Sequence, residues 1–573
     1  TYFPAEARYG MISFPDLLRR IQDLYKSNPE KVAKSAAEVS EALRQYQQMP
    51  GGEVLPDAEA VFDSLYQQLN SSFDSQQGGF GQAPKFPHAG DIDFLMQLYH
   101  YTGNRKSLGM ALFTLQKMAA GGIYDQVGGG FHRYSTDEKW LVPHFEKMLY
   151  DNALLAPLYA DAYRLTGEMS YRRTAESIID FVLRELQDAG GGFYATLDAD
   201  SEGKEGIYYV WSAQELAELL EEDLKKVFFT VYDISQEGNW EGRNILQAAK
   251  PVPQAARELH LSPAETEKKL QQAKKIILKA RQKRVRPGLD NKILADWNGM
   301  MISALLQVYQ LNEDKTIAQS AEKALDFLLN NYLDDQMRLA HFVKNEKERI
   351  PGYLDDYAWL VRALLDAFET LQNPRYLSIA RELTDSAIKK FWDDQNGGFY
   401  FTAEEADNTI TRLRQNYDAS TPAGNHIMTG NLLRLSAYSG NKNYREKAET
   451  VFRIYADDLE KRSAALSSLV TALLYFHYQP LEVTLYPGSN EHRMQEIQRL
   501  LGELYIPNKI SLDASVNFPA GLLDPMLIKG GPEGDDPAVI LCYRQSCSLP
   551  LKSLREISRA LENLDIFVQR PQD

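Results

Sequence analysis

Helical periodicity dominates the chain from residue 57 to residue 477. Apolar residues recur at intervals of three and four over segments of ordinary helix length, and glycine-rich loops separate these segments. In the second half, the spacing predicts helices at 294–311, 314–332, 353–371, 374–392, 422–438, 443–459 and 463–477. Two amphipathic helices are predicted earlier, at 14–27 and 29–48. The pattern therefore indicates a long array of helices.

An acidic residue followed closely by Gly-Gly-Phe recurs along this array. The copies are DSQQGGF ending at Phe80, DQVGGGF ending at Phe131, DAGGGFY around Phe193 and DQNGGFY around Phe399, and DDQMRLAHF ending at Phe342 is a copy without the glycines. Each copy lies between two helices, so the repeating unit is a helical hairpin. Hairpins of this kind cannot bury their apolar faces singly, and we expect a solenoid or a toroid with its loops on one end.

Two segments interrupt the pattern. Residues 49–56, MPGGEVLP, are rich in proline and glycine and predict a linker at a domain boundary. Between residues 212 and 286 the repeat is lost, and helices at 215–229 and 262–283 flank a polar loop. We interpret 212–286 as an insertion on the array, with most of its charges on a solvated face.

The last hundred residues have a different pattern. LEVTLYP, NKISLDA and PAVILCYR are strand-like, and helices are predicted at 490–503 and 552–563. We therefore expect a mainly α chain with a short N-terminal helical region at 1–50, a helical array at 51–479 and a small α/β domain at 480–573.

Composition narrows the class of protein. With 573 residues, 44% hydrophobic and 25% charged, the chain is long enough for two or three ordinary domains. The net charge is −16, and Lys and Arg form no cluster, so a nucleic-acid partner is not expected. No apolar run is long enough to cross a bilayer, so a membrane partner is not expected either.

The cysteines and the amino end add two expectations. Cys542 and Cys547 are the only cysteines, which excludes a secreted-type disulfide framework and favours a reducing, cytoplasmic location. Their spacing differs from a redox C-x-x-C motif, and paired structural thiols are the safer interpretation. The chain starts at Thr1 without a recognisable leader and looks like a fragment of a longer protein.

The segment 121–152 contains the greatest density of candidate functional groups. After three glycines come side chains that suit a polyhydroxylated or anionic ligand, namely Phe131, His132, Arg133 and Tyr134, with Trp140 as a further stacking surface. His144 and Asp151 then share one face of a predicted helix, so an imidazole and a carboxylate form a candidate acid/base pair. Glu146 is the alternative partner of His144. A histidine at a helix start is often only a cap or a satisfied buried group.

A second stretch, LDADSEGKEGIYYVW, is crowded with carboxylates. Asp198 and Glu205 are its candidate acid/base residues, because neighbouring carboxylates raise one another's pKa, and Trp211 is a candidate stacking surface. The first residues resemble a calcium loop, but the twelfth position is Tyr209 instead of Glu, so a calcium site is rejected. A solvated acidic turn remains the simpler alternative.

Three further stretches begin predicted helices. The candidate catalytic carboxylates there are Asp296 and Asp356, and the candidate substrate-binding residues are Trp297, Asn298, Asp355, Tyr357, Asn425 and His426. An aspartate at a helix start is more commonly an N-cap, and a lone histidine is more commonly structural. No H-x-x-x-H, C-x-x-C or G-x-S-x-G motif is present, so neither a metal, nor another cofactor, nor a serine nucleophile is predicted.

Several long motifs carry a family resemblance. GGFHRYSTDEKWLVPHFEKMLYDNA, LDADSEGKEGIYYVW, EGNWEG, RPGLDNKILADWNGMMISA and the late C-x-x-x-x-C resemble the thioredoxin-domain-containing (DUF255) proteins of the YyaL type, which are related to spermatogenesis-associated protein 20. The resemblance implies a thioredoxin-like domain followed by an (α/α)6 toroid of the six-hairpin glycosidase class, similar to N-acylglucosamine 2-epimerases. Only the tail of the thioredoxin-like domain is present, without its cysteine motif, and His426 stands where the family usually has serine.

Two functional hypotheses follow. The first is a carbohydrate-active enzyme, either a glycoside hydrolase or a sugar epimerase or isomerase, with His144 as the general acid/base and a small carbohydrate as substrate. The second is a non-catalytic scaffold that holds a glycan, or a protein client of the thioredoxin-like domain. Both require the five stretches to meet at one end of a closed helical ring.

Overall fold

The computed structural model describes residues 3–8, 10–47, 52–345, 347–406, 410–528, 530–532, 534–544 and 546–564. The first part of the predicted linker 49–56 lies outside these residues, as does the end of the predicted C-terminal domain after residue 564.

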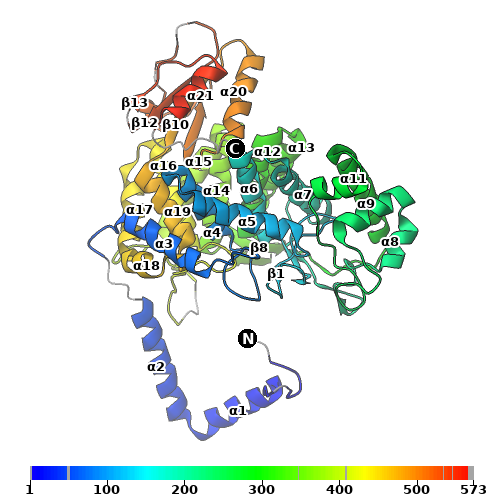
Figure 1. Cartoon of the computed structure of the whole chain (residues 1–573). Helices are drawn as coiled ribbons and strands as arrows, with labels where there is room; N and C mark the ends of the chain where they lie inside the picture. The colour runs from blue at the N-terminus through cyan, green and yellow to red at the C-terminus, as the bar shows by residue number, and fades with distance from the viewer. Residues whose placement is uncertain are drawn as a thin grey trace.

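A closed double ring of helices forms the centre of the described chain (Figure 1). Six inner helices contact one another around the ring, and the last contacts the first. In order, they are α4 (Ala89–Thr102), α6 (Leu149–Thr166), α12 (Ala295–Asn312), α14 (Leu354–Leu371), α16 (Gly424–Ser439) and α19 (Ser467–Tyr478). Each packs against an outer helix, α3 (Ala58–Ser72), α5 (Arg105–Ala120), α7 (Met169–Glu185), α13 (Lys315–Asn331), α15 (Pro374–Phe391) or α17 (Lys442–Ile454). This arrangement is an (α/α)6 toroid, which confirms the predicted fold class.

The inner helices are apolar on most sides because they are covered by the outer ring and by one another. In α12, for example, thirteen residues are buried, including Met301, Ile302 and Leu305. The outer helices are amphipathic and bury only one face; α7 buries Ile178, Ile179 and Val182. A single hydrophobic core therefore runs around the toroid.

The glycine-rich repeats all lie where an outer helix ends and the next inner helix begins. Short bridges close these loops, such as Phe73 with Phe80, Tyr124 with Phe131 and Trp392 with Phe399. Because the repeats share this position, they lie at one end of the ring, together with the N-terminal ends of the inner helices. We call this end the rim.

An asparagine of the inner helix holds the repeat phenylalanine in three of the described hairpins. Asn298 accepts a hydrogen bond from the backbone N–H of Phe193 at 2.7 Å and donates one to its carbonyl oxygen at 3.0 Å. Asn425 makes the same pair of bonds with Phe399, at 2.9 and 2.6 Å. Asn152 does so with Phe131, at 2.7 and 3.1 Å. In the copy without glycines, the Tyr357 hydroxyl instead accepts the N–H of Leu339 at 2.9 Å.

The rim also carries short strands and one hairpin. The small strands are β1 (Tyr134–Ser135) with β2 (Pro143–His144), β3 (Lys147–Met148) with β4 (Thr196–Leu197) and β7 (Leu289–Asp290), and β5 (Asp200–Ser201) with β6 (Lys204–Glu205). The hairpin β8 (Ala340–Asn345) and β9 (Glu348–Pro351) was not predicted, because it lies in the repeat that lacks glycines.

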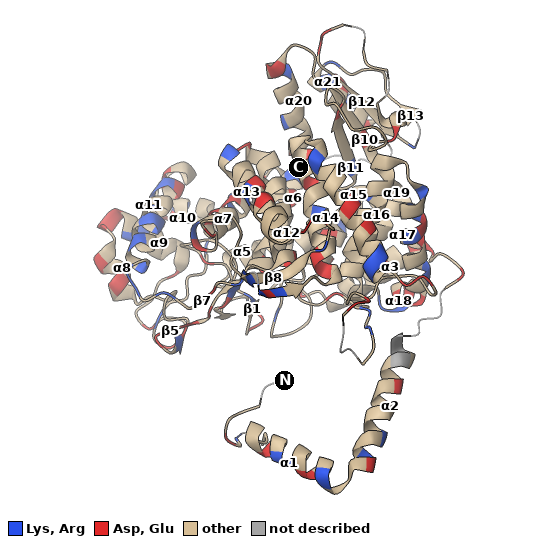
Figure 2. Ribbon diagram, turned by 180° about the vertical axis from the view of Figure 1, so that it is seen from behind, with Lys and Arg blue, Asp and Glu red and all other residues tan. Residues whose placement is uncertain are grey.

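The insertion contains more helices than expected. Its elements are α8 (Ala213–Leu219), α9 (Glu222–Tyr232), α10 (Val252–Leu259) and α11 (Pro263–Arg281). They lie beside α7 and have a hydrophobic cluster of their own (Figure 1). Charged residues lie along α8, α9 and α11, acidic only on α8 and of both signs on α9 and α11, as expected for a solvated face (Figure 2). The prediction of one continuous helix at 215–229 is wrong. Leu220 has extended backbone angles, which end α8 before α9 begins.

Two other predicted helices are also divided. The segment 443–459 breaks after Ile454 and continues as α18 (Ala456–Lys461), and the segment 463–477 begins with a 3-10 turn, η1 (Ser463–Ala465).

A buried salt bridge joins the insertion to the rim. Arg281 of α11 lies 2.8 Å from Asp125 of the DQVGGGF loop, and Lys147 lies 2.7 Å from the same carboxylate.

A small α/β domain follows the toroid, as predicted. Its main sheet has the order β11, β10, β12, β13, with β10 parallel to β11 and antiparallel to β12. Its elements are β10 (Leu481–Tyr486), α20 (Glu491–Glu503), β11 (Lys509–Asp513), η2 (Pro525–Leu527), β12 (Ala538–Tyr543), β13 (Ser546–Cys547) and α21 (Leu554–Glu562). A disulfide joins Cys542 to Cys547.

This domain covers the end of the ring opposite the rim. Arg164 near the end of α6 donates to the carbonyl oxygen of Gly502, and Gln372 after α14 contacts Ser511 and Asp513. Figure 1 shows the domain on one side of the toroid, and β1 and β8 on the other. The α/β domain thus closes the ring at the C-terminal ends of the inner helices.

The first two helices, α1 (Phe14–Ser27) and α2 (Pro29–Gln47), contact each other and project away from the toroid (Figure 1). Their assignment to a thioredoxin-like domain stays a prediction. In the described chain, none of the helices combines the length and hydropathy needed to span a membrane.

Candidate active site at the rim of the toroid

The structure brings the five candidate stretches together at the rim. The first and second meet where His144 Nδ1 lies 2.8 Å from Glu205 Oε1. The first and third meet where the rings of Tyr150 and Trp297 lie 4.8 Å apart.

The remaining stretches continue this chain of contacts. Asp296 N–H donates to Asp356 Oδ1 at 3.1 Å, which joins the third stretch to the fourth. Gly424 N–H donates to Asp355 Oδ1 at 2.9 Å, which joins the fourth to the fifth. Groups that are far apart in sequence are therefore joined by one continuous chain of contacts.

The first cluster consists of Arg133, His144, Glu146, Tyr150 and Glu205. His144 lies between two carboxylates, with Nε2 3.3 Å from Glu146 Oε2. Hydrogen bonds to Glu146 and then Glu205 raise the pKa of His144, although partial burial opposes them. Arg133 lies 3.7 Å from Glu146 and bonds to the Tyr150 hydroxyl at 3.3 Å. Because both its ring nitrogens have carboxylate partners, His144 is better suited to holding Glu146 in place than to accepting a proton.

Asp151 lies next to this cluster at the start of α6. Its side chain is buried, and Oδ2 has no hydrogen-bond partner among the described residues. Burial raises the pKa of Asp151 well above its usual value, Arg133 opposes this, and Glu146 adds to it. A neutral carboxylic acid is therefore expected at this position.

The second cluster consists of Asp296, His341, Asp355 and Asp356. The Asp356 carboxylate is fully buried and accepts bonds from Asp296 N–H, Tyr353 N–H at 2.7 Å and His341 Nδ1 at 2.9 Å. Burial and the nearby Asp356 charge raise the pKa of Asp296 well above its usual value. The same two causes raise the pKa of Asp355 to about 7. Asp355 is partly exposed, so a group that titrates near neutrality is accessible at the rim.

One group in this cluster has the geometry of a cation site. Ligand atoms of Asp296, His341 and Asp356 all lie within 4.8 Å of one another. His341 Nδ1 contacts Asp356, and this bond raises the pKa of the imidazole although burial opposes it. A metal ion would have to replace the proton shared by this pair, so the set suits an ion pair as well as it suits a metal.

A third cluster surrounds His426. The buried ring places Nδ1 2.8 Å from Asp418 and 3.1 Å from the Ser468 hydroxyl, and that hydroxyl donates to Asp418 at 2.6 Å. Burial opposes ionisation of Asp418, but His426 and its hydrogen bonds hold the pKa below its usual value. This pairing joins α16 to α19 at the rim.

Several predicted site residues belong to the interior instead. Phe131 and His132 are buried, and His132 Nδ1 bonds to the carbonyl oxygen of Phe145 at 2.8 Å. Trp140 is fully buried, and its indole N–H donates to the carbonyl oxygen of Gln77 at 2.9 Å. Trp211 is buried beneath the Arg284 guanidinium, 3.6 Å from its ring. None of these rings offers a face to a ligand at the rim in this structure.

Of the other predicted residues, some hold the repeat loops, one is exposed in a turn and one remains at the rim. Asn298, Asn425 and Tyr357 hold the repeat loops, as described above. Asp198 is exposed, and its carboxylate accepts the N–H of Asp200 at 3.3 Å, as in an ordinary turn. Tyr134 remains at the rim, where its ring stacks on His144 at 5.1 Å.

Three residues at the rim were missed by the sequence analysis. His341 precedes the phenylalanine of the degenerate repeat, so comparison of the repeats offered a signal for it. Asp418 lies in the fifth stretch, eight residues before His426, and nothing in that spacing indicates the contact. Tyr150 lies between the predicted residues Glu146 and Asp151, and its role depends on Trp297 from another hairpin.

Comparison with known proteins places this geometry in a context. Residues 267–463 match glycosyl hydrolase family 76. The fold resembles the crystal structure of D-mannose isomerase, with a TM-score of 0.48 and 12% identity, covering 73% of this chain and 97% of that one. It also resembles a family 76 α-mannanase of Bacteroides thetaiotaomicron, with a TM-score of 0.44 and 11% identity over 74% of this chain and 96% of that one.

Full-length sequence relatives are more similar. Spermatogenesis-associated protein 20 of Homo sapiens is 32% identical over 98% of this chain and 77% of the relative. The protein of the same name in Mus musculus is 31% identical over 98% of this chain and 76% of its own length. The chain therefore belongs to the family of spermatogenesis-associated protein 20.

Proposed function

We propose that this protein is a carbohydrate-active enzyme that hydrolyses a glycosidic bond at the rim of the toroid. The observation that carries the proposal is the meeting of five distant stretches there, with carboxyl groups in contrasting environments. Buried or paired carboxylates surround one partly exposed acid, Asp355, whose pKa is about 7. Contrasting carboxyl groups at one site are typical of acid/base catalysis.

Asp355 is the proposed general acid. A carboxyl group with a pKa near 7 is partly protonated at neutral pH and can give its proton to the leaving oxygen of a glycoside. The Gly424 N–H holds one of its oxygens at 2.9 Å. The other oxygen is therefore the one assigned to the substrate.

Glu146 is the proposed second carboxylate, acting as a base toward water or as a nucleophile. Its side chain is 24% exposed, and His144 and Arg133 hold Oε2 from two directions. The partly buried rings of Tyr134 and Trp297 lie nearby and suit the apolar face of a sugar.

The family match supports this substrate class. Residues 267–463, which match glycosyl hydrolase family 76, include the whole second cluster. The first cluster lies outside the matched residues, so the role of Glu146 depends on geometry alone.

A second candidate is a sugar epimerase or isomerase. The observation that favours it is that two histidines, His341 and His426, each contact a carboxylate at the rim through Nδ1. Carboxylate partners fix the tautomer and raise the basicity of an imidazole, which suits proton transfer at a sugar carbon.

One experiment separates these functions. The full chain is incubated with a panel of aryl glycosides and oligosaccharides, and separately with free sugars in D2O. Release of new reducing ends supports hydrolysis, whereas exchange of a carbon-bound hydrogen without hydrolysis supports epimerisation or isomerisation. Binding without either reaction would support a non-catalytic scaffold.

Asp355→Asn tests the assigned acid. We expect hydrolysis to fall by about 10²-fold or more, which is the usual contribution of a general acid. Asp335→Asn is the matched control, because Asp335 is an exposed aspartate outside the three clusters. Unchanged turnover in Asp355→Asn would remove Asp355 from the mechanism.

A further inference from the structure

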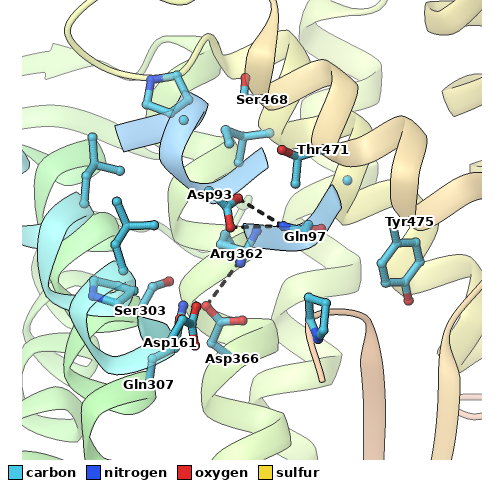
Figure 3. Close-up of a pocket in the computed structure, with 18 of the residues that line it drawn as sticks. Asp93, Gln97, Asp161, Ser303, Gln307, Arg362, Asp366, Ser468, Thr471 and Tyr475 are labelled. Carbon is cyan, nitrogen blue, oxygen red and sulfur yellow. Dashed lines mark hydrogen bonds and ion pairs between the residues drawn. The ribbon is translucent and has the colours of Figure 1, made fainter. Parts of the chain in front are cut away.

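A cavity of about 270 Å³ lies inside the ring, between the rim and the α/β domain. Its walls come from inner helices, from residues 504–507 and from Lys509 at the start of β11. Figure 3 shows Asp93 and Gln97 of α4 on one wall, with Ser468, Thr471 and Tyr475 of α19 on another. The sequence analysis named only His426 among the residues that line it.

Polar atoms without partners line this cavity. Among the described residues, Trp359 Nε1, His426 Nε2, and the hydroxyls of Tyr475 and Tyr505 are buried and have no hydrogen-bond partner. Trp359, His426 and Tyr505 are each more than nine-tenths buried. Buried donors and acceptors in folded proteins are nearly always satisfied. These groups, from three helices and the segment before β11, are therefore available to hydrogen-bond a water or a ligand inside the cavity.

The charged side chains of the wall mostly satisfy one another. Arg164 pairs with Asp161 at 2.6 Å, and Arg434 pairs with Asp366 at 2.7 Å and Glu369 at 2.7 Å. These internal pairs leave little net charge for an ionic ligand. Asp93 accepts two bonds from Gln97, both at 3.1 Å (Figure 3). A neutral ligand with hydroxyl groups suits such a wall.

Apolar side chains complete the lining. Leu154, Leu158, Met300 and Ile427 face the same space as the polar atoms. Apolar walls with a few polar groups are typical of small-molecule sites, and a cavity of this size lies just below the range of roughly 300–1,000 Å³ for larger ligands. A monosaccharide or alditol has both C–H faces and hydroxyls that can donate and accept.

We propose that this cavity binds one small neutral polyol, of monosaccharide size, at a site that borders the His426 cluster below the rim and does not include Asp355 or Glu146. Trp359 donates to a ligand hydroxyl, and the hydroxyls of Tyr475 and Tyr505 and His426 Nε2 exchange hydrogen bonds with the others. Tyr505 precedes β11, so the α/β domain supplies part of the site. The proposal goes beyond the hydrolytic function, because it does not depend on Asp355 or Glu146.

The test measures binding of xylitol and of D-glucose to the full chain by calorimetry and ligand-observed NMR. We expect saturable binding of at least one probe. Tyr505→Phe and Tyr475→Phe should each weaken it about tenfold, because each removes one hydroxyl group with little change of shape. Tyr25→Phe is the matched control, since Tyr25 is 65% exposed on α1.

A blocking variant keeps the proposal falsifiable if a hydrogen-bonding variant folds poorly. Gly430 lines the cavity on α16, and a Cβ added there meets only the Ala472 Cβ, at 4.0 Å. Gly430→Leu should therefore fold and abolish binding, whereas Asp355→Asn should bind normally. Absence of saturable binding to the wild-type chain, or binding that Gly430→Leu leaves unchanged, would overturn the proposal.

Discussion

At the scale of single residues, the rim is governed by how each ionisable group is paired. His144 has two carboxylate partners, Asp355 has a backbone N–H, and Asp151 keeps one oxygen without a partner among the described residues. Sequence patterns predicted which segments carry these groups. They named Glu146 as a partner of His144, and the two side chains are in contact, but they did not predict partners such as Glu205 and Gly424, which come from other hairpins.

The pH dependence of activity should follow the protonation of Asp355. Its pKa is about 7, and the proposed reaction needs its protonated form. Activity should therefore be retained below pH 7 and fall about tenfold per pH unit above it. A kcat/KM profile on an active glycoside measures this. A profile that stays flat through pH 7 to 9 would exclude Asp355 as the acid.

The buried salt bridge at Asp125 makes a prediction about stability. Burial alone would raise its pKa, but Arg281 and Lys147 hold the pKa of Asp125 well below its usual value. This contribution to stability is present above the unfolded pKa of about 3.9 and is lost as pH falls below it.

Asp125→Asn should lower the free energy of unfolding by about 3–5 kcal/mol, because it leaves two buried cations without a counter-charge. Urea denaturation at pH 7 measures the change, with Asp335→Asn as a surface control. A loss below about 1 kcal/mol would mean that the two cations find other partners.

At the scale of elements, the repeated unit is an outer helix, a glycine loop and an inner helix whose asparagine holds the loop. The Gly-Gly-Phe pattern predicted the hairpins and their common end. It could not predict that Asn298 and Asn425 are structural, because their positions at helix starts equally suit ligand binding. Long-range backbone contacts decide between these roles.

Asn298→Ala should destabilise the fold by about 2–3 kcal/mol, since it leaves the buried N–H and carbonyl of Phe193 without their partner. Asn331→Ala is the control, because Asn331 is exposed at the end of α13 and should change stability by less than about 0.5 kcal/mol. Chemical denaturation of both variants compares them, and equal midpoints would contradict the structural role.

The glycines of the repeat differ in how much space a side chain added at each position would have. Gly130 has φ +76°, and an added Cβ would lie 2.3 Å from the Phe181 ring. Gly81 has φ +75° with nothing within 4 Å. Gly130→Ala should therefore cost about 1–3 kcal/mol more than Gly81→Ala, because both add backbone strain but only the first overpacks the core. Thermal unfolding of the pair tests this difference.

At the scale of the whole molecule, the toroid and the α/β domain share one core. Ile510, Leu512 and Leu522 belong to the same hydrophobic cluster as the inner helices, although the domain also has a cluster of its own. Periodicity predicted the two architectures separately. It could not show that the domain closes the ring, because the anchoring contacts of Arg164 and Gln372 join positions far apart in sequence.

Removal of residues 480–573 should therefore destabilise the toroid instead of releasing an intact ring. We expect the truncated chain to unfold at lower urea concentration and to expose apolar surface that binds a hydrophobic dye. An unchanged unfolding midpoint for the toroid would show that the two parts are independent.

The common direction of the inner helices has an electrostatic consequence. Aligned peptide dipoles give each helix N-terminus a partial positive charge of roughly half an elementary charge. All the inner helices point this end toward the rim, so their macrodipoles add there. A bound sugar that develops positive charge would be repelled by such a ring. The aspartates at the rim offset this field, which gives them a role in charge balance even where they transfer no proton.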